Sequence, residues 1–156
     1  MPTQHQSNAD RRQQSHQLIE KLQHERDALW SLYCGFASLK PLTASESVKK
    51  SLTTFSQMLI DYISLGHFGV YERLLSGKER RDNIQEVAKA LYPQLEATTE
   101  VAVAFNDKYE SADKLNTFTD LERDLSILGE NLAQRIDLED QFCNLIINSD
   151  RRLLTR

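Results

Sequence analysis

Apolar residues recur at intervals of three and four through most of this chain, and this spacing is the strongest constraint on its fold. Between Val48 and Tyr62 the successive intervals are 4, 3, 4 and 3, and a similar stripe runs from Phe118 to Ile146. Such intervals place side chains on one face of an α-helix. No segment shows a convincing period of two. We therefore expect an all-α fold, an antiparallel bundle of four main helices plus short ones.

Proline, glycine and capping residues set the expected helix ends. The first helix should stop near Lys40 and Pro41, because the residue before a proline avoids the α conformation. The second should begin after Thr43 or Ser45, both suitable N-caps, and Gly66 should end or kink it. The expected helices span residues 12–38, about 44–66, 82–91 with a new or kinked continuation from Pro93 to 109, and 116–148.

The length of 156 residues predicts a single domain. Residues 1–12 are polar and Gln-rich, which favours a disordered tail, so the helical domain is expected over 13–150 with a C-terminal tail over 151–156. The sequence contains neither a membrane-spanning apolar run nor a secretory signal. We therefore expect a cytoplasmic protein in which Cys34 and Cys143 remain reduced.

Acidic charge is concentrated in the C-terminal third. The net charge is −4, which disfavours direct binding to nucleic acid. Residues 94–148 hold 12 acidic and 4 basic residues, whereas the rest of the chain holds 11 acidic and 15 basic residues. Two interpretations stay open: a solvated helix face, or a surface complementary to a basic partner.

Neither a metal site nor an active site is predicted. His16, Glu20 and His24 stand at intervals of four, but at ~100° per residue they lie opposite the apolar side of their helix and should face water. Neither cysteine sits in a nucleophile motif. A histidine phosphotransfer bundle would use His67 and would need a lysine nearby on the same helix. The first lysine after His67 is Lys78, which does not fit this pattern. We expect no enzyme activity and no cofactor.

One charged pair falls within the apolar stripe of the last helix. Glu139 lies near the centre of this stripe, and Arg135 precedes it by four residues, which is one helical turn. A charge near a core needs a partner. We expect Arg135 and Glu139 to form a structural ion pair.

The second helix contains the best functional candidate. Asp61, Ser64 and Phe68 stand at positions i, i+3 and i+7. At ~100° per residue they fall within about 60° of one another, opposite the apolar face, provided that the helix continues past Gly66. An acid, a small hydroxyl and an aromatic side chain on one line are typical of a surface that docks another helix. The alternative, in which Gly66 turns the chain and buries Phe68, stays open.

Three stretches, taken together, resemble the signature of the Rsd/AlgQ family of bacterial anti-sigma factors: LIDYISLGHFGVYERLL (59–75), YPQLEATTE (92–100) and ILGENLAQRIDLEDQF (127–142). They cover about a quarter of the chain. The resemblance implies an all-α bundle that binds the housekeeping sigma factor of RNA polymerase, mainly through the C-terminal sigma domain that reads the −35 promoter element.

The resemblance also implies roles for individual residues. The aspartate, serine and phenylalanine that contact sigma in this family match Asp61, Ser64 and Phe68, and we expect Tyr71 and Glu72 to flank them. The implied function is sequestration of the sigma factor, which lowers housekeeping transcription. The alternatives are an adaptor for another regulatory protein, a phosphotransfer bundle or a metal-binding bundle.

Overall fold

The computed structural model describes residues 4–71, 82–112 and 118–154, and within these ranges it contains helices and no strand. The all-α prediction is therefore confirmed. In chain order the elements are α1 (Gln4–Gly35), the 3₁₀-helix η1 (Phe36–Leu39), α2 (Glu46–Ser64), the π-helix η2 (Leu65–Tyr71), α4 (Asp82–Tyr109) and α5 (Leu121–Leu154). Among the described helices, none combines the length and hydrophobicity that crossing a membrane requires.

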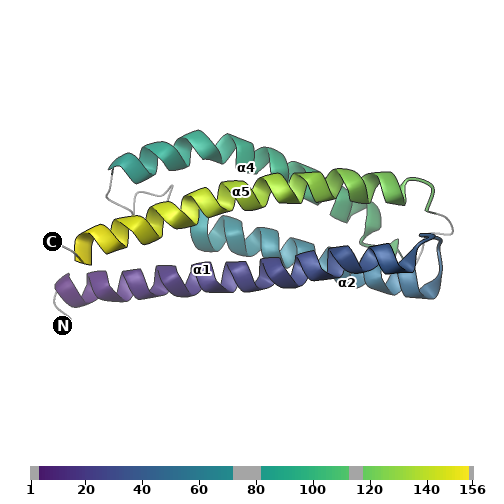
Figure 1. The fold of residues 1–156 in the computed structure, drawn as a ribbon, viewed down its shortest axis with the longest axis horizontal. Coiled ribbons are helices and arrows are strands. Elements are labelled where there is room, and N and C mark those ends of the chain that lie inside the picture. The colour runs from purple at the N-terminus through teal and green to yellow at the C-terminus, as the bar shows by residue number, and fades with distance from the viewer. Residues whose placement is uncertain (1–3, 72–81, 113–117, 155–156) are drawn as a thin grey trace.

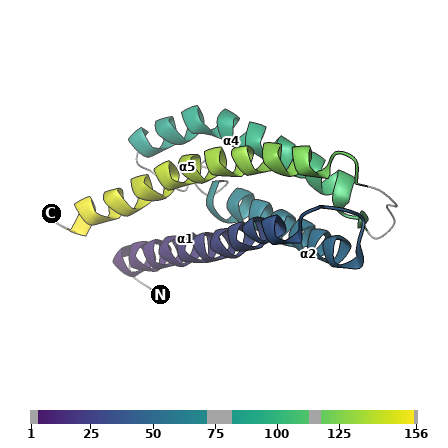
Figure 2. The same cartoon turned by 45° about the vertical axis from the view of Figure 1, so that its right-hand side comes forward.

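The four long helices form an antiparallel bundle. Helix α1 packs against α2, α2 against α4, and α4 against α5, while α5 returns beside α1. Figure 1 shows both ends of the chain at the same end of the bundle. In the turned view of Figure 2, the α4–α5 pair lies above the α1–α2 pair. Helix α2 therefore has both α1 and α4 as neighbours.

Two helices extend beyond their expected ends. Helix α1 begins at Gln4 and so includes part of the segment 1–12 that the sequence indicates as a tail, and α5 continues to Leu154. Gln and Arg are intrinsically good helix formers, so a helix can extend where the apolar stripe is absent. Pro93 lies within a continuous α4 and does not separate two helices.

Local chemistry accounts for the start of α2. Lys40 has an extended backbone (φ −67°, ψ 142°) before Pro41, which ends the helical run that began in α1. Ser45 is the N-cap of α2, and its hydroxyl accepts a hydrogen bond from the Val48 amide at 3.3 Å. Helix α2 therefore starts at a defined register, which decides which of its side chains face inward.

The core is apolar along the bundle and rich in aromatic rings. The Phe55 ring of α2 stands edge-on to Phe36 at 5.6 Å and to Phe105 of α4 at 5.8 Å between centroids. Such edge-to-face pairs stabilise a core beyond the burial of their area. Leu22, Leu52 and other inward residues of the long helices are fully buried. This packing holds the inner face of α2 and leaves its outer face to solvent.

Candidate functional site

The outer side of α2 and η2 carries the three residues singled out by the sequence. Asp61 is exposed, Ser64 is half-buried, and Phe68 is 68% exposed. On the inner side of the same helix, Leu59 and Tyr62 are fully buried. We refer to Asp61, Ser64 and Phe68 as the docking ridge.

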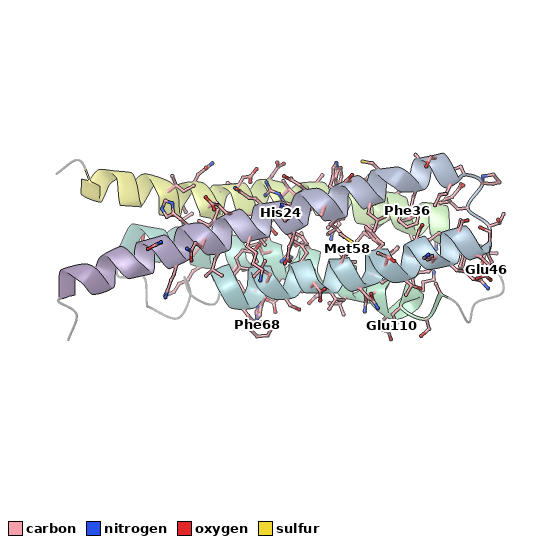
Figure 3. All side chains as sticks on the ribbon, turned by 90° about the horizontal axis from the view of Figure 1, so that it is seen from below. His24, Phe36, Glu46, Met58, Phe68 and Glu110 are labelled. Carbon is pink, nitrogen blue, oxygen red and sulfur yellow. The ribbon has the colours of Figure 1, made fainter. Side chains whose placement is uncertain are left out.

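The chain passes Gly66 without leaving the helix. Residues Leu65–Tyr71 continue from α2 as a π-helix, so the alternative that turns the chain at Gly66 and buries Phe68 is wrong. A π-helix bonds residue i to residue i+5, so each residue advances less around the axis than the ~100° of an α-helix. Phe68 is therefore displaced around the helix from its expected line. Figure 3 shows its ring pointing out of the bundle on the side of α2 away from α1.

Phe68 is the most exposed large apolar side chain among the described residues. Ile127 follows at 50% exposure, and the others are smaller valines. The His67 ring stands edge-on to the Phe68 ring, with 4.8 Å between centroids and 86° between planes. Covering a solvent-exposed aromatic ring with a partner lowers the free energy, because apolar area is then removed from water.

The two residues expected to flank the ridge have different outcomes. Tyr71 is only 2% exposed, so the prediction that it lies on the surface beside the ridge is wrong. The π-helical turn brings it to the inner side, where its ring packs on Phe142 with 5.4 Å between centroids. Glu72 lies outside the described residues.

Beneath α2, charged and polar side chains meet inside the bundle. Arg135 and Glu139 are both completely buried, and the Nε atom of Arg135 lies 3.0 Å from Oε1 of Glu139. The hydroxyl of Tyr62 donates a hydrogen bond to the same carboxylate oxygen. We call Tyr62, Thr98, Arg135 and Glu139 the buried polar network.

The network links α5 to the other helices. Nη1 of Arg135 donates to the hydroxyl oxygens of Thr98 at 3.0 Å and Thr99 at 2.8 Å, both on α4. The guanidinium also lies over the rings of Tyr62 and Tyr71, at 5.7 and 5.6 Å from their centroids. From α1, Nη1 of Arg26 lies 3.7 Å from Oε2 of Glu139. A buried charge is tolerated when it is paired and hydrogen-bonded in this way.

The ionisation states in the network follow from burial. Desolvation raises the pKa of Tyr62 and Tyr71 well above the ordinary value, and the negative charge of Glu139 raises both further. Burial acts to lower the pKa of Arg135, but Tyr71, Glu139 and Tyr62 outweigh it and the pKa is raised. The hydroxyls therefore keep their protons, and the guanidinium keeps its charge.

Sequence reasoning missed part of this network. Helical spacing places Tyr62 on the apolar side of α2 but does not indicate the bond from its hydroxyl to Glu139, and it does not single out Thr98 as a partner of Arg135. A signal for Thr98 exists, because it lies three residues after buried Leu95 and four before buried Ala102, at core spacing in α4. For Arg26 the spacing carries no such signal, because its carboxylate partners lie on α5, which is far from α1 in the sequence although it packs beside it.

Other chemistry has little support among the described side chains. Within them, no group of three or more His, Cys, Asp and Glu residues is arranged to hold a metal ion. His16, Glu20 and His24 are all exposed on α1. Cys143 is buried, and burial followed by the charge of Glu139 raises the pKa of its thiol to about 11. Its thiol is therefore protonated near neutral pH and is a poor nucleophile.

The acidic segment faces solvent mainly on α4 and α5. One cluster is paired between α4 and the start of α5: Nζ of Lys108 lies 2.7 Å from Asp124 of α5 and 3.6 Å from Asp120, which directly precedes α5. Many other acids are exposed and make no ion pair within the described residues: Glu96, Glu100, Asp107, Glu130 and Asp137. The α4 and α5 faces thus present net negative charge to the surroundings.

Two comparisons with known proteins point to the same family. The family described as "Regulator of RNA polymerase sigma(70) subunit, Rsd/AlgQ" matches residues 1–147. Proteins named "Regulator of sigma D" from Shigella boydii serotype 4 (strain Sb227) and Escherichia coli (strain K12 / DH10B) are each 34% identical over 142 residues, covering 88% of both chains. No solved structure matches the chain.

Proposed function

Because the chain belongs to the Rsd/AlgQ family of regulators of the RNA polymerase sigma(70) subunit, we propose that it binds and sequesters the housekeeping sigma factor through the docking ridge. The observation that carries this proposal is Phe68, a phenylalanine ring 68% exposed on an otherwise well-packed helix. The contact is with the C-terminal sigma domain. The protein acts as a non-enzymatic regulator in the cytoplasm.

Each ridge residue has a distinct role in this contact. Phe68 inserts into an apolar pocket of the sigma domain and is the anchor. Asp61, which makes no ion pair within the described residues, pairs with a basic side chain that otherwise approaches DNA phosphate. Ser64 is small, so it lets a helix of the partner approach closely.

Binding of the sigma domain accounts for the proposed fall in transcription from housekeeping promoters. A domain that reads the −35 element with a helix-turn-helix cannot bind DNA while its recognition surface is covered. Sequestered sigma factor is also withheld from core polymerase. Transcription from housekeeping promoters falls as a result, and alternative sigma factors gain access to the polymerase.

The exposed acids of α4 and α5 contribute through association kinetics. A net negative surface attracts a positively charged partner over a range limited by salt screening. We expect the association rate constant to fall markedly as salt is added, with a smaller change in dissociation. An association rate independent of salt would contradict this role.

The experiment is a binding titration of the full chain with the purified C-terminal sigma domain. Phe68→Ala should weaken binding by about 2 kcal/mol, or roughly 30-fold in Kd, because an anchor is truncated. Asp61→Ala should weaken it less. The matched controls are Ile127→Ala, another exposed apolar side chain, and Asp27→Ala, an exposed acid on α1; both should bind as wild type. Wild-type affinity of both ridge variants would overturn the assignment.

A further inference from the structure

The segment that presents Phe68 has an unusual backbone. Helix α2 changes at Leu65 into a π-helix, and the Leu65 amide bonds to the carbonyls of both Asp61 and Tyr62 at this junction. Short π-helical segments within helices are rare and often occur at functional sites. The direction of Phe68 depends on this turn, since an α-helical continuation would rotate residue 68 differently around the axis.

The turn is filled from the inside by one aromatic ring. Tyr71 follows Gly66 by five residues, which is the hydrogen-bond spacing of a π-helix. A Cβ atom added to Gly66 would lie only 3.1–3.3 Å from the Tyr71 ring and its hydroxyl. The ring therefore lies directly against the Gly66 backbone, a position that any side chain at residue 66 would crowd.

The Tyr71 ring has little freedom to move away. It is 2% exposed, it packs on Phe142, and the Arg135 guanidinium lies 5.6 Å from its centroid. Farther along the turn, Gly69 faces Leu18 of α1, whose Cδ2 atom would lie 3.5 Å from an added Cβ. The turn is therefore held between the bundle core and α1.

We infer that Gly66 and Tyr71 are positioning residues for partner binding: the ring of Tyr71, seated against the Gly66 backbone, holds the π-helical turn that aims Phe68 outward. This inference rests on the proposed function, because it concerns the same ridge. Neither residue contacts the partner. A side chain held in its bound direction loses less conformational entropy on binding, which increases affinity without a new contact.

The first test is Gly66→Ala in the full chain, titrated with the C-terminal sigma domain. The added methyl group should disfavour the π-helical turn and rotate Phe68, so we expect a loss of affinity of about tenfold. Gly35→Ala is the matched control, because an added Cβ at this helical glycine meets nothing within 4 Å and binding should not change. Gly66→Ala with wild-type affinity would overturn the inference.

A double-mutant cycle separates positioning from general destabilisation. If the turn acts by aiming Phe68, then Phe68→Ala should cost little further affinity in the Gly66→Ala background, although it costs at least tenfold in the wild-type background. A merely structural role predicts additive losses, and additive losses would refute the inference. Wild-type affinity of both Phe68→Ala and Asp61→Ala, each made in the wild-type background, would instead refute the proposed function.

Two changes at Tyr71 keep the test informative if Gly66→Ala does not fold. Tyr71→Phe retains the ring and removes a hydroxyl that has no hydrogen-bond partner within the described residues, so binding should match wild type. Tyr71→Leu removes the ring and should weaken binding about tenfold, again without adding to the loss from Phe68→Ala. Equal affinities for the Leu and Phe variants would contradict the inference.

Discussion

Asp61 and Tyr62 are neighbours in the chain, yet their side chains lie in opposite environments. The Asp61 carboxylate is exposed and unpaired within the described residues, whereas the Tyr62 hydroxyl is buried against the Glu139 carboxylate. One helix thus carries the proposed docking surface on its outer side and part of the buried polar network on its inner side. Outer residues can be changed with little effect on folding, while inner polar residues are constrained by their partners.

Among substitutions that test this difference between the outer and inner sides, Glu139→Ala should have the largest effect on stability. The substitution leaves the Arg135 guanidinium buried without its carboxylate, so we expect the free energy of unfolding to fall by about 3–5 kcal/mol, with a lower Tm. Chemical denaturation and thermal melting measure this. Asp61→Ala on the outer side should change stability by less than about 0.5 kcal/mol. An unchanged melting curve for Glu139→Ala would remove Glu139 from the core.

A smaller effect is expected from Tyr62→Phe. This substitution keeps the ring and removes only the hydroxyl that donates to the Glu139 carboxylate, so the free energy of unfolding should fall by about 2 kcal/mol. Tyr71→Phe is the matched control, because that hydroxyl makes no hydrogen bond within the described residues and its loss should be nearly neutral. Equal destabilisation by the two substitutions would show that hydrogen bonding does not distinguish these tyrosines.

The smallest effect concerns Asp124, which is neither fully buried nor fully exposed. Burial opposes ionisation, but hydrogen bonds from Lys108 and Tyr109 outweigh it and lower the pKa of Asp124 from its ordinary value of 3.8. The ionised carboxylate therefore stabilises the fold above about pH 4, and this contribution is lost as the pH falls through the lowered pKa. Asp124→Asn should cost below about 1 kcal/mol at pH 7.

Denaturation of wild type and Asp124→Asn at several pH values measures this linkage. The difference between the two proteins should be constant near neutral pH and should shrink below about pH 4, because protonation removes the charge from the wild-type side chain as well. A difference that grows on acidification would have the wrong sign and would contradict the lowered pKa.

The sequence predicts most of the fold and the ridge because both depend on helical spacing. Intervals of three and four identify the inner side of α2, and the same counting brings Arg135 and Glu139 onto one inner face of α5. It also places Asp61 and Ser64 on the outer side. These features require only that an α-helix continues, which the amphipathic pattern itself indicates.

Counting at ~100° per residue fails where the helix changes type. The π-helix from Leu65 to Tyr71 alters the rotation, so Tyr71 faces inward although the sequence suggests a surface position. A backbone change of this kind depends on packing between Gly66 and Tyr71, which a local pattern does not encode. Contacts between distant segments, such as Arg26 with Glu139, are missed for the same reason.

The position of the buried polar network in the sequence affects when the bundle can complete its polar contacts during synthesis. Its acceptor, Glu139, and its cation, Arg135, both lie on α5, which follows α2 and α4 along the chain and is synthesised after them. Until that helix docks, Tyr62 and Thr98 lack the charged groups that they bond in the finished bundle. The polar contacts that join α2 and α4 to α5 therefore form only after α5 has been synthesised and has docked on the other helices.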